Sequence, residues 1–270
     1  MSECIVITSG KGGVGKTTTS ANLGVALALA GKSVVVVDAD IGLRNLDVVL
    51  GLENRIVYDL VNVIEGECRL KQALIKDKRA KGLSLLPAAQ TRDKNAVGPE
   101  DMKRLVDELK ESFDVVLIDC PAGIEQGFRN SIAGADRALI VTTPEVSAIR
   151  DADRIIGLVE AHELPEPELL INRYRPGMVN RGDMLGRDDI LEILAIPLVG
   201  IIPDHEDIIT STNRGMPIAY DELSIVGQAY RRIARRVLGE TIPIPEFTSD
   251  NRFWSAFKRW MGLSDAQEVA

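Results

Sequence analysis

Aromatic residues, cysteines and long apolar runs are all scarce in this chain of 270 residues. Aromatics make up 4% of the sequence, and only two of them are tryptophans. No run approaches the roughly 20 consecutive apolar residues that a helix needs to cross a bilayer, so any membrane contact must be peripheral. The three cysteines, Cys4, Cys68 and Cys120, lie far apart without metal-ligand spacing, which argues against a disulfide framework and is typical of reduced thiols.

The N-terminus and the net charge argue against two further classes of protein. The opening MSECIVITSGKGG has no basic segment leading into a long apolar stretch and no small-residue cleavage pattern, so we expect no secretory signal and a cytoplasmic protein. A net charge of −8 argues against a nucleic-acid-binding protein whose whole surface is basic, although it is compatible with a local basic patch.

Short apolar segments rich in valine and isoleucine alternate with helix-like segments. The apolar segments are CIVIT, SVVVVD, LSLLPA, DVVLIDC, RALIVTT, ELLINR and PLVGIIP. Because they are apolar throughout, we expect strands that are buried on both faces. Helix-like segments lie between most of them, for example at 17–30, 99–110 and 147–162. This alternation predicts an α/β fold, with a mainly parallel twisted sheet and helices on both of its faces.

The organisation changes near the C-terminus. Two prolines in TIPIPEFTSD forbid a helix, and the core pattern stops there, which is typical of a stiff, extended linker. The expected organisation is an α/β domain over 1–240, a proline-containing linker over 241–251, an amphipathic helix over 252–263 and a tail over 264–270.

The clearest motif, GKGGVGKT, follows the first apolar segment and matches the phosphate-loop pattern of a glycine, four residues and then Gly-Lys-Thr. Its glycines let backbone amides point inward at phosphates, and the helix that follows adds its positive end. Lys16 then lies on the outer phosphates, and the Thr17 hydroxyl helps to hold Mg²⁺. The expected phosphate-binding residues are Gly10, Lys11, Gly12, Gly13, Val14, Gly15, Lys16, Thr17 and Thr18.

Lys11 is a second lysine inside this loop, and an ordinary phosphate loop needs only Lys16. A second cation indicates another anion or the phosphates of another subunit. The stretch KGGVGKTT resembles the deviant phosphate loop of the MinD/ParA family of ATPases. In that family the first lysine reaches across a two-fold axis to nucleotide bound by the partner. The resemblance therefore implies ATP hydrolysis, an ATP-bound homodimer, a P-loop NTPase fold and a catalytic role for Lys11 beside Lys16.

Acidic strand ends complete the expected nucleotide site. VVVVDADIGLRNLD and FDVVLIDCPAG both carry acids at a strand end, and ligands of open parallel sheets bind beyond the carboxyl ends of the strands. We expect Asp119 to assist Thr17 at Mg²⁺ and Gly123 to offer its amide to the γ-phosphate. The resemblance implies that Asp40 orients the attacking water, a task of positioning that needs no covalent nucleophile. For Asp38 a catalytic role and a strand-end cap remain open.

The resemblance covers about residues 2–263 and is strongest to the cell-division branch of the family, which places the septum. It rests on DIGLRNLDVVLGLENRIVYDLVNVI, QALIKDK, LLPAAQTRDK, DCPAGIE, PEVSAIRDADRIIG and RGDML. It implies a first switch at 42–47 and adenine contacts from Asn172 and Asp204, for which ordinary turn residues are the alternative. It also implies two partners, a MinC-like division inhibitor and a MinE-like activator.

The same resemblance places partner docking near the dimer face. The residues concerned are Arg44, Asn45, Ser147, Arg150, Asp151 and Asp153. For Ser147 and Asp151 the alternative is helix capping.

A basic helix offers a competing function. YRRIARRVLGE places Arg231, Arg232, Arg235 and Arg236 on one predicted helix. ParA-type relatives hold DNA through phosphate contacts on basic surfaces, so a DNA-partitioning ATPase is the alternative function. Most such charge runs are solvated helix faces, and we expect no nucleic-acid partner.

The scarce aromatics gather at the C-terminus, in FWSAFKRWMGL. On a helical wheel the five large apolar side chains occupy an arc of about 120°, with cations flanking or opposite it. The apolar residues are Phe253, Trp254, Phe257, Trp260 and Met261, and the cations are Arg252, Lys258 and Arg259. This pattern is typical of a helix in an anionic membrane interface, and the resemblance implies the same. The alternative is docking on the protein's own core or on a sister subunit.

Because this helix is short, we expect its binding to the membrane to depend on ATP. One short interfacial helix is a marginal anchor, whereas a dimer makes the second insertion intramolecular and raises avidity by roughly 10²–10⁴. We therefore expect a switch that binds the inner face of the cell membrane when ATP closes the dimer and leaves after hydrolysis.

Overall fold

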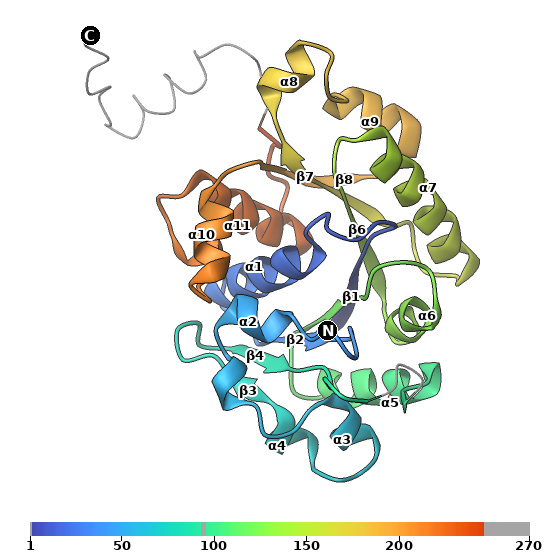
Figure 1. Cartoon of the computed structure of the whole chain (residues 1–270), viewed down its shortest axis with the longest axis vertical. Helices are drawn as coiled ribbons and strands as arrows, with labels where there is room; N and C mark the ends of the chain where they lie inside the picture. The colour runs from blue at the N-terminus through green and yellow to red at the C-terminus, as the bar shows by residue number, and fades with distance from the viewer. Residues whose placement is uncertain (1, 93–95, 246–270) are drawn as a thin grey trace.

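The computed structural model describes residues 2–92 and 96–245. Within them, eight strands form one sheet in the order β3-β4-β2-β5-β1-β6-β7-β8 (Figure 1). Neighbouring strands are parallel except β3 and β4, which are antiparallel. The strands are β1 (Glu3–Thr8), β2 (Val34–Asp38), β3 (Ile75–Lys76), β4 (Leu83–Leu86), β5 (Val115–Asp119), β6 (Arg137–Thr142), β7 (Glu168–Tyr174) and β8 (Leu198–Pro203).

Helices cover both faces of the sheet (Figure 1). One face carries α1 (Lys16–Leu29), α2 (Leu46–Leu50), α10 (Asp207–Asn213), the short helix η3 (Ile218–Tyr220) and α11 (Ile225–Val237). The other face carries α3 (Leu60–Ile64), α4 (Leu70–Ala73), α5 (Pro99–Lys110), α6 (Gln126–Ile132), α7 (Val146–Ala161) and α9 (Arg187–Leu194). The remaining short helices are η1 (Glu53–Arg55) and α8 (Pro176–Asn180).

The central strands show why the apolar segments lack alternation. In β1, Cys4 and Val6 pack into the core on one face, whereas Ile5 and Ile7 pack into the core on the other. Successive side chains of a strand point to opposite faces, so a strand covered on both faces needs apolar residues at every position. The predicted α/β fold with a mainly parallel sheet is confirmed.

The seven predicted strands are all present, and one strand was missed. β3 has only two residues, Ile75 and Lys76, which pair with Leu85 and Ser84 of β4. A strand of this length has no periodicity that a sequence pattern could reveal. The helices predicted at 17–30, 99–110 and 147–162 begin and end within one residue of α1, α5 and α7.

The chain after α11 is held on the body of the domain as far as it is described. The Arg236 side chain donates to the carbonyls of Ile242 and Pro243 at 2.8 and 2.6 Å, and Ile244 packs against the core on the opposite face. The first residues of the predicted linker therefore lie against the domain, while the predicted amphipathic helix at 252–263 lies outside the described residues. None of the helices in 2–92 and 96–245 has the length and apolar character to span a membrane.

Candidate nucleotide site

The phosphate loop connects β1 to α1 at the edge where the parallel strands end. Gly13 and Gly15 have φ values of 79° and 97°, in the left-handed region that favours glycine. Gly15 is the N-cap of α1, and no side chain caps this helix. The first amides of α1 are thus left for a ligand at the loop, an arrangement that suits phosphate.

Lys16, the first residue of α1, lies back across the loop. Its Nζ donates to Ser9 Oγ at 3.0 Å, and the residue is only 8% exposed. The Ser9 hydroxyl in turn donates to the carbonyl of Lys11 at 2.8 Å. The charge of Lys16 is therefore held within the loop. Sequence reasoning missed Ser9 because the phosphate-loop pattern begins one residue later.

A buried carboxylate lies beneath the loop. Asp119, at the end of β5, is 3% exposed and accepts a hydrogen bond from Ser20 Oγ at 2.8 Å. Burial raises the pKa of the Asp119 carboxyl to about 6, against hydrogen bonds from Thr17 and Ser20 that lower it. The Asp119 carboxylate and the Thr17 hydroxyl are oxygen ligands of the kind that Mg²⁺ prefers. These residues therefore fit a magnesium ion beside bound phosphates.

Asp38 is the register partner of Asp119 on the neighbouring strand β2. Its Oδ1 accepts from the Asp40 amide at 3.0 Å, and its Oδ2 accepts from the Leu46 amide at 3.2 Å. Burial, followed by the charge of Asp119, raises the pKa of Asp38 to about 7. Of the two roles left open by the sequence, these contacts match the strand-end cap: Asp38 holds one amide just before the predicted first switch at 42–47 and one within it.

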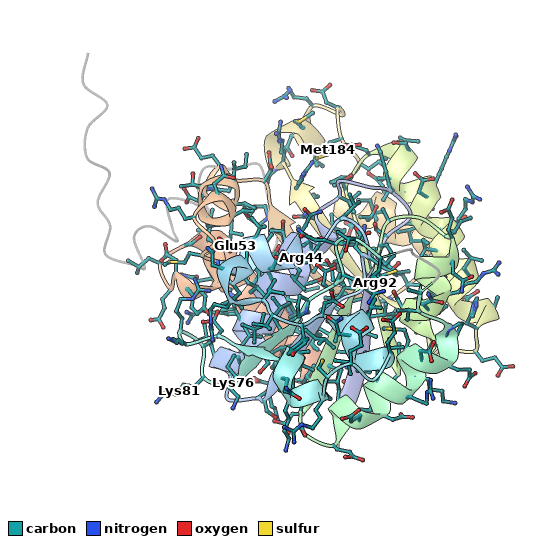
Figure 2. The ribbon with its side chains drawn as sticks, turned by 60° about the horizontal axis from the view of Figure 1, so that its bottom comes forward. Arg44, Glu53, Lys76, Lys81, Arg92 and Met184 are labelled. Atoms are coloured by element: carbon teal, nitrogen blue, oxygen red, sulfur yellow. The ribbon has the colours of Figure 1, made fainter. Side chains whose placement is uncertain are left out.

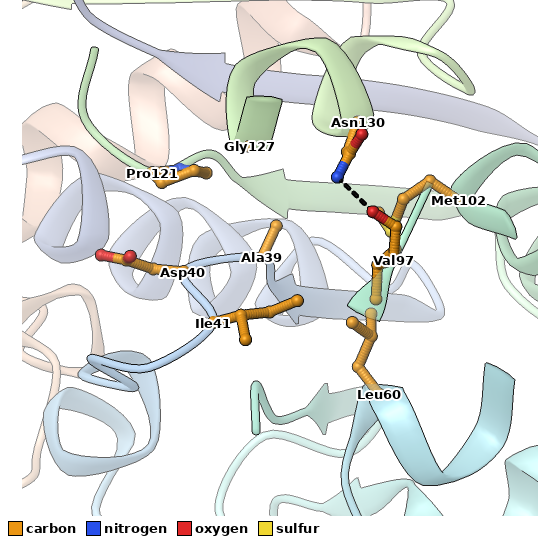
Figure 3. A pocket seen from close by; sticks show the side chains of 9 residues that line it. All are labelled: Ala39, Asp40, Ile41, Leu60, Val97, Met102, Pro121, Gly127 and Asn130. Atoms are coloured by element: carbon orange, nitrogen blue, oxygen red, sulfur yellow. Dashed lines mark hydrogen bonds between the residues drawn. The ribbon is translucent and has the colours of Figure 1, made fainter. Parts of the chain in front are cut away.

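Asp40 lies at the rim of a small apolar cavity of about 20 Å³, room for about one water molecule (Figure 3). Ala39 and Ile41 line it from the segment after β2, and Pro121 lines it from the segment after β5. The Asp40 carboxyl points away from the cavity in Figure 3. Gly123, in the same segment as Pro121, has a φ of 96° and no atom within 4 Å of the position that a Cβ would take.

Lys11 turns outward from the loop. Its Nζ forms an ion pair with Glu145 Oε2 at 3.4 Å and donates to Ser147 Oγ at 3.2 Å. Glu145 is the N-cap of α7, so Ser147 does not have the capping role that was its alternative. The Lys11 side chain is 43% exposed. The two lysines of the loop therefore take different positions, one held within it and the other on its outer surface.

The other predicted docking residues lie on two surfaces flanking the loop. On α7, Arg150 and Asp153 are exposed, and the backbone of Asp151 lies against Gly10. In the predicted first switch, Asn45 is exposed, whereas Arg44 forms an ion pair with the buried Asp47 at 2.9 Å and is 17% exposed at its side chain. Figure 2 labels Arg44 beside α2. Docking at these residues stays a prediction.

A cavity of about 440 Å³ opens beside the loop, between the ends of β7 and β8 and helix α10. The two residues predicted at the adenine, Asn172 and Asp204, both line it. Asn172 is 4% exposed and donates from Nδ2 to the Val14 carbonyl at 2.7 Å, so its amide also fixes the loop. Asp204 accepts from the Arg175 guanidinium at 2.5 Å. The sequence did not single out the arginines of this wall, Arg173 and Arg175, although both follow Asn172 closely in NRYR.

The arginines of α11 are engaged within the chain. Arg236 donates to the carbonyl of Val199 at 3.0 Å as well as to the two linker carbonyls, and Arg235 forms an ion pair with Glu240 at 2.7 Å. The same holds for Arg231 and Arg232, whose acceptors are Ala219, Tyr220, Glu222 and Gln228. Arg231 and Arg236 therefore tie α11 to other segments, while Arg232 and Arg235 have partners on or just after the same helix, and this geometry does not favour a DNA surface.

Comparison with known proteins places this geometry among nucleotide-binding proteins. Residues 5–218 match the family described as CobQ/CobB/MinD/ParA nucleotide binding domain. The septum site-determining protein MinD of Bacillus subtilis (strain 168) is 59% identical over 254 residues, which cover 93% of this chain and 95% of that protein.

Two solved structures extend the likeness to the fold. In the MinC:MinD cell division protein complex of Aquifex aeolicus, the matching chain is 51% identical with a TM-score of 0.84, over 91% of this chain and 99% of that chain. The septum site-determining protein MinD of Pyrococcus horikoshii, complexed with Mg-ADP, is 30% identical with a TM-score of 0.80, over 88% and 96% of the two chains.

Proposed function

This chain belongs to the MinD family of septum site-determining proteins, within the CobQ/CobB/MinD/ParA nucleotide-binding domain family, and from that premise we propose that it is an ATP-dependent switch of the membrane surface. It dimerises and binds the membrane with ATP, and leaves after hydrolysis. The observation that carries the proposal is the pair of lysines in one phosphate loop, with Lys16 held within it and Lys11 exposed on its outer side.

ATP binds with its phosphates in the loop and its base in the cavity beside Asn172 and Asp204. Thr17 and Asp119 hold magnesium, which neutralises charge on the phosphates when it is bound. The P. horikoshii relative was solved with Mg-ADP, which supports this choice of ligand. Lys16 binds the outer phosphates through its Nζ.

Hydrolysis then requires the positioning of one water molecule. The Asp40 carboxyl orients it, and Asp38 fixes the Asp40 backbone by accepting a hydrogen bond from its amide. The amide of Gly123 donates to the γ-phosphate from the opposite segment. Orientation and charge neutralisation supply the rate enhancement without a covalent step.

Lys11 makes the switch dimeric. Without ATP it stays on Glu145 and Ser147, an exposed pair that contributes little stability. Phosphates bound in a second copy of this chain are a stronger anion than one exposed carboxylate, so Lys11 exchanges partners when ATP closes the dimer. Each lysine then contacts nucleotide in the opposite subunit.

The dimer presents two C-terminal segments to anionic lipid on the inner face of the cell membrane, and the ADP form remains cytoplasmic. A MinC-like inhibitor and a MinE-like activator dock beside the loop, on the surfaces of α7 and the first switch. The solved complex of the Aquifex aeolicus relative with MinC supports the first of these partners.

Co-sedimentation with anionic liposomes in ATP and in ADP tests the proposal. The intact protein is expected to pellet mainly with ATP, and a Trp254→Glu, Trp260→Glu variant is expected to stay in solution. The matched control is Ile193→Glu, Leu223→Glu, which adds the same charges at apolar positions that are 52% and 78% exposed on the body. This control should pellet as the intact protein does.

Equal binding of the ATP and ADP forms would contradict the proposal, because a ligand shifts only those states that it distinguishes. If neither form pellets, the C-terminal segment instead seals a protein contact. Its deletion, Phe253 to Ala270, would then change the oligomeric state in the absence of lipid.

A further inference from the structure

Arg79 connects segments that are far apart in the sequence. Its Nη1 donates to the carbonyl of Gly215 at 2.8 Å, and its Nη2 donates to the carbonyl of Leu50. Its guanidinium carbon lies 5.2 Å from the centre of the Tyr220 ring. Asp77, whose side chain is 1% exposed, forms an ion pair with Arg79 at 2.8 Å and accepts from the Tyr220 hydroxyl at 3.0 Å. One guanidinium is thus fixed between two backbone carbonyls by an acid and an aromatic ring.

The two carbonyls belong to the ends of α2 and α10, which lie side by side (Figure 1). Gly51 and Gly215 touch there: a Cβ on Gly51 would lie 2.4 Å from the Gly215 oxygen, and a Cβ on Gly215 would lie 2.6 Å from the Gly51 Cα. Both have left-handed φ values, 63° and 58°. Arg79 reaches this contact from the turn between Lys76 and Lys81, which Figure 2 labels. The backbone contact and the guanidinium together hold the two helix ends.

The opposite ends of these helices belong to the nucleotide site. α2 begins at Leu46, which lies within the predicted first switch at 42–47 and whose amide is held by Asp38. α10 contributes Ile208 and Ile209 to the wall of the base cavity. A displacement of α10 therefore moves the Gly215 carbonyl, and Arg79, which donates to the Gly215 and Leu50 carbonyls, transmits that displacement to α2.

We propose that Arg79 is a positioning residue that couples occupancy of the base cavity to the position of the first switch. The inference rests on the proposed nucleotide function. The planar fork of an arginine can donate to two carbonyls at once while it stacks on a ring, whereas the single ammonium of a lysine cannot reproduce this geometry. A site built in this way lets the switch respond to the base as well as to the phosphates.

Hydrogen exchange of backbone amides tests the coupling with two ligands, ADP and ribose 5′-diphosphate, each saturating with Mg²⁺. They differ only in the base, and neither carries a γ-phosphate, so hydrolysis does not enter. In the unaltered protein we expect amides 46–51 to exchange about fivefold more slowly with ADP, the lower end of typical coupling between linked sites. In Arg79→Gln we expect this difference to fall below about twofold, while amides 208–213 of α10 keep their protection by ADP.

Arg235→Gln is the matched control, because the Arg235 guanidinium pairs with the nearby Glu240 and lies outside the Arg79 contact. It should behave as the unaltered protein does. Arg79→Lys keeps the charge without the fork and is expected to lose the coupling as Arg79→Gln does, which covers the case in which the glutamine variant folds poorly. A thermal melt of each variant checks that it is folded.

Persistence of the difference at 46–51 in both Arg79 variants would overturn the inference, and so would its absence from the unaltered protein. Loss of ADP protection in α10 itself would also overturn it, since Arg79 would then only hold the cavity. Failure of the proposed function has a separate signature. If the protein neither hydrolyses ATP nor pellets with lipid, but the exchange difference is present and depends on Arg79, the switch assignment fails and the coupling stands.

Discussion

The contact between the phosphate loop and α7 can be tested with a single methyl group. A Cβ on Gly10 would lie 2.2 Å from the carbonyl oxygen of Asp151 and 2.6 Å from the Asp151 Cβ. The first of these is a backbone atom in the middle of α7, so no rotamer change relieves the overlap. Gly10→Ala must therefore push the loop away from α7 by roughly an ångström, because ordinary carbon contacts lie near 3.5–4 Å.

The expected cost follows from this geometry. Inserting one carbon into a packed contact costs about 1–3 kcal/mol. For a protein of this size, about 1 kcal/mol lowers the melting temperature by roughly 2–4 °C, so Gly10→Ala should melt roughly 2–12 °C lower. ATP should also bind more weakly, because the displaced loop no longer presents its amides and Lys16 together.

Gly12→Ala is the control within the same loop. A Cβ there would meet only the Cβ of Ala122, at 3.8 Å, an ordinary contact. Because the alanine also restricts the unfolded chain, by about 0.4–1 kcal/mol, Gly12→Ala should melt at or slightly above the unaltered protein.

Thermal melts of the nucleotide-free proteins measure the difference, followed by ATP titration. Equal melting temperatures for the two variants would refute the reasoning, since they would show that the loop is not wedged against α7. Asp151→Gly combined with Gly10→Ala should restore little, because the clashing carbonyl remains.

Three further outcomes follow from the site. The pKa of Asp38 is raised from 3.8 to about 7, so the folded form holds this proton more tightly and its stability falls as the pH rises through that window. Between pH 5 and pH 8 the free energy of unfolding should fall by roughly 2–3 kcal/mol from this group alone. Urea unfolding of the nucleotide-free Asp38→Asn variant, with a metal chelator present, should show a correspondingly smaller decrease with pH. The same decrease in the variant and in the unaltered protein would contradict this prediction. Asn172→Ala leaves the Val14 carbonyl without its donor, so the free energy of unfolding measured in urea should fall by about 1–3 kcal/mol and ATP should bind more weakly. Equal unfolding of the variant and the unaltered protein would contradict this role. Glu145→Gln removes the resting partner of Lys11, so light scattering should detect the ATP dimer at lower protein concentration with no change in melting temperature; a requirement for more protein would count against the exchange of partners.

The fold was predictable because its signals are local and repeated. A strand such as SVVVVD is buried on both faces, so its composition alone distinguishes it from a surface strand. β3 escaped prediction because its two residues pair with β4 only through tertiary contact. The phosphate loop was predictable for a different reason, since the glycines at positions 13 and 15 must take left-handed conformations to turn amides toward phosphate.

The roles of individual acids and bases were less predictable. The sequence was compatible with either a catalytic role or a strand-end cap for Asp38. The structure favours the cap, because two backbone amides donate hydrogen bonds to the Asp38 carboxyl. The four arginines of α11 formed a basic run in the sequence, yet their donors are used on acceptors within the same chain. The charged residues can be identified from the sequence, whereas the partner of each one depends on which segments the fold brings together.

The sequence by itself determined the α/β class, the position of the phosphate loop and the family, because each depends on residue types at fixed short spacing. Only the tertiary structure decided where Lys11 rests, which carbonyls Arg79 joins, and that Gly10 lies against α7. Each case includes a contact between residues more than a hundred positions apart: Lys11 with Glu145, Arg79 with Gly215 and Gly10 with Asp151. No local pattern specifies such pairs, since they arise only when the sheet order places distant strands and helices side by side.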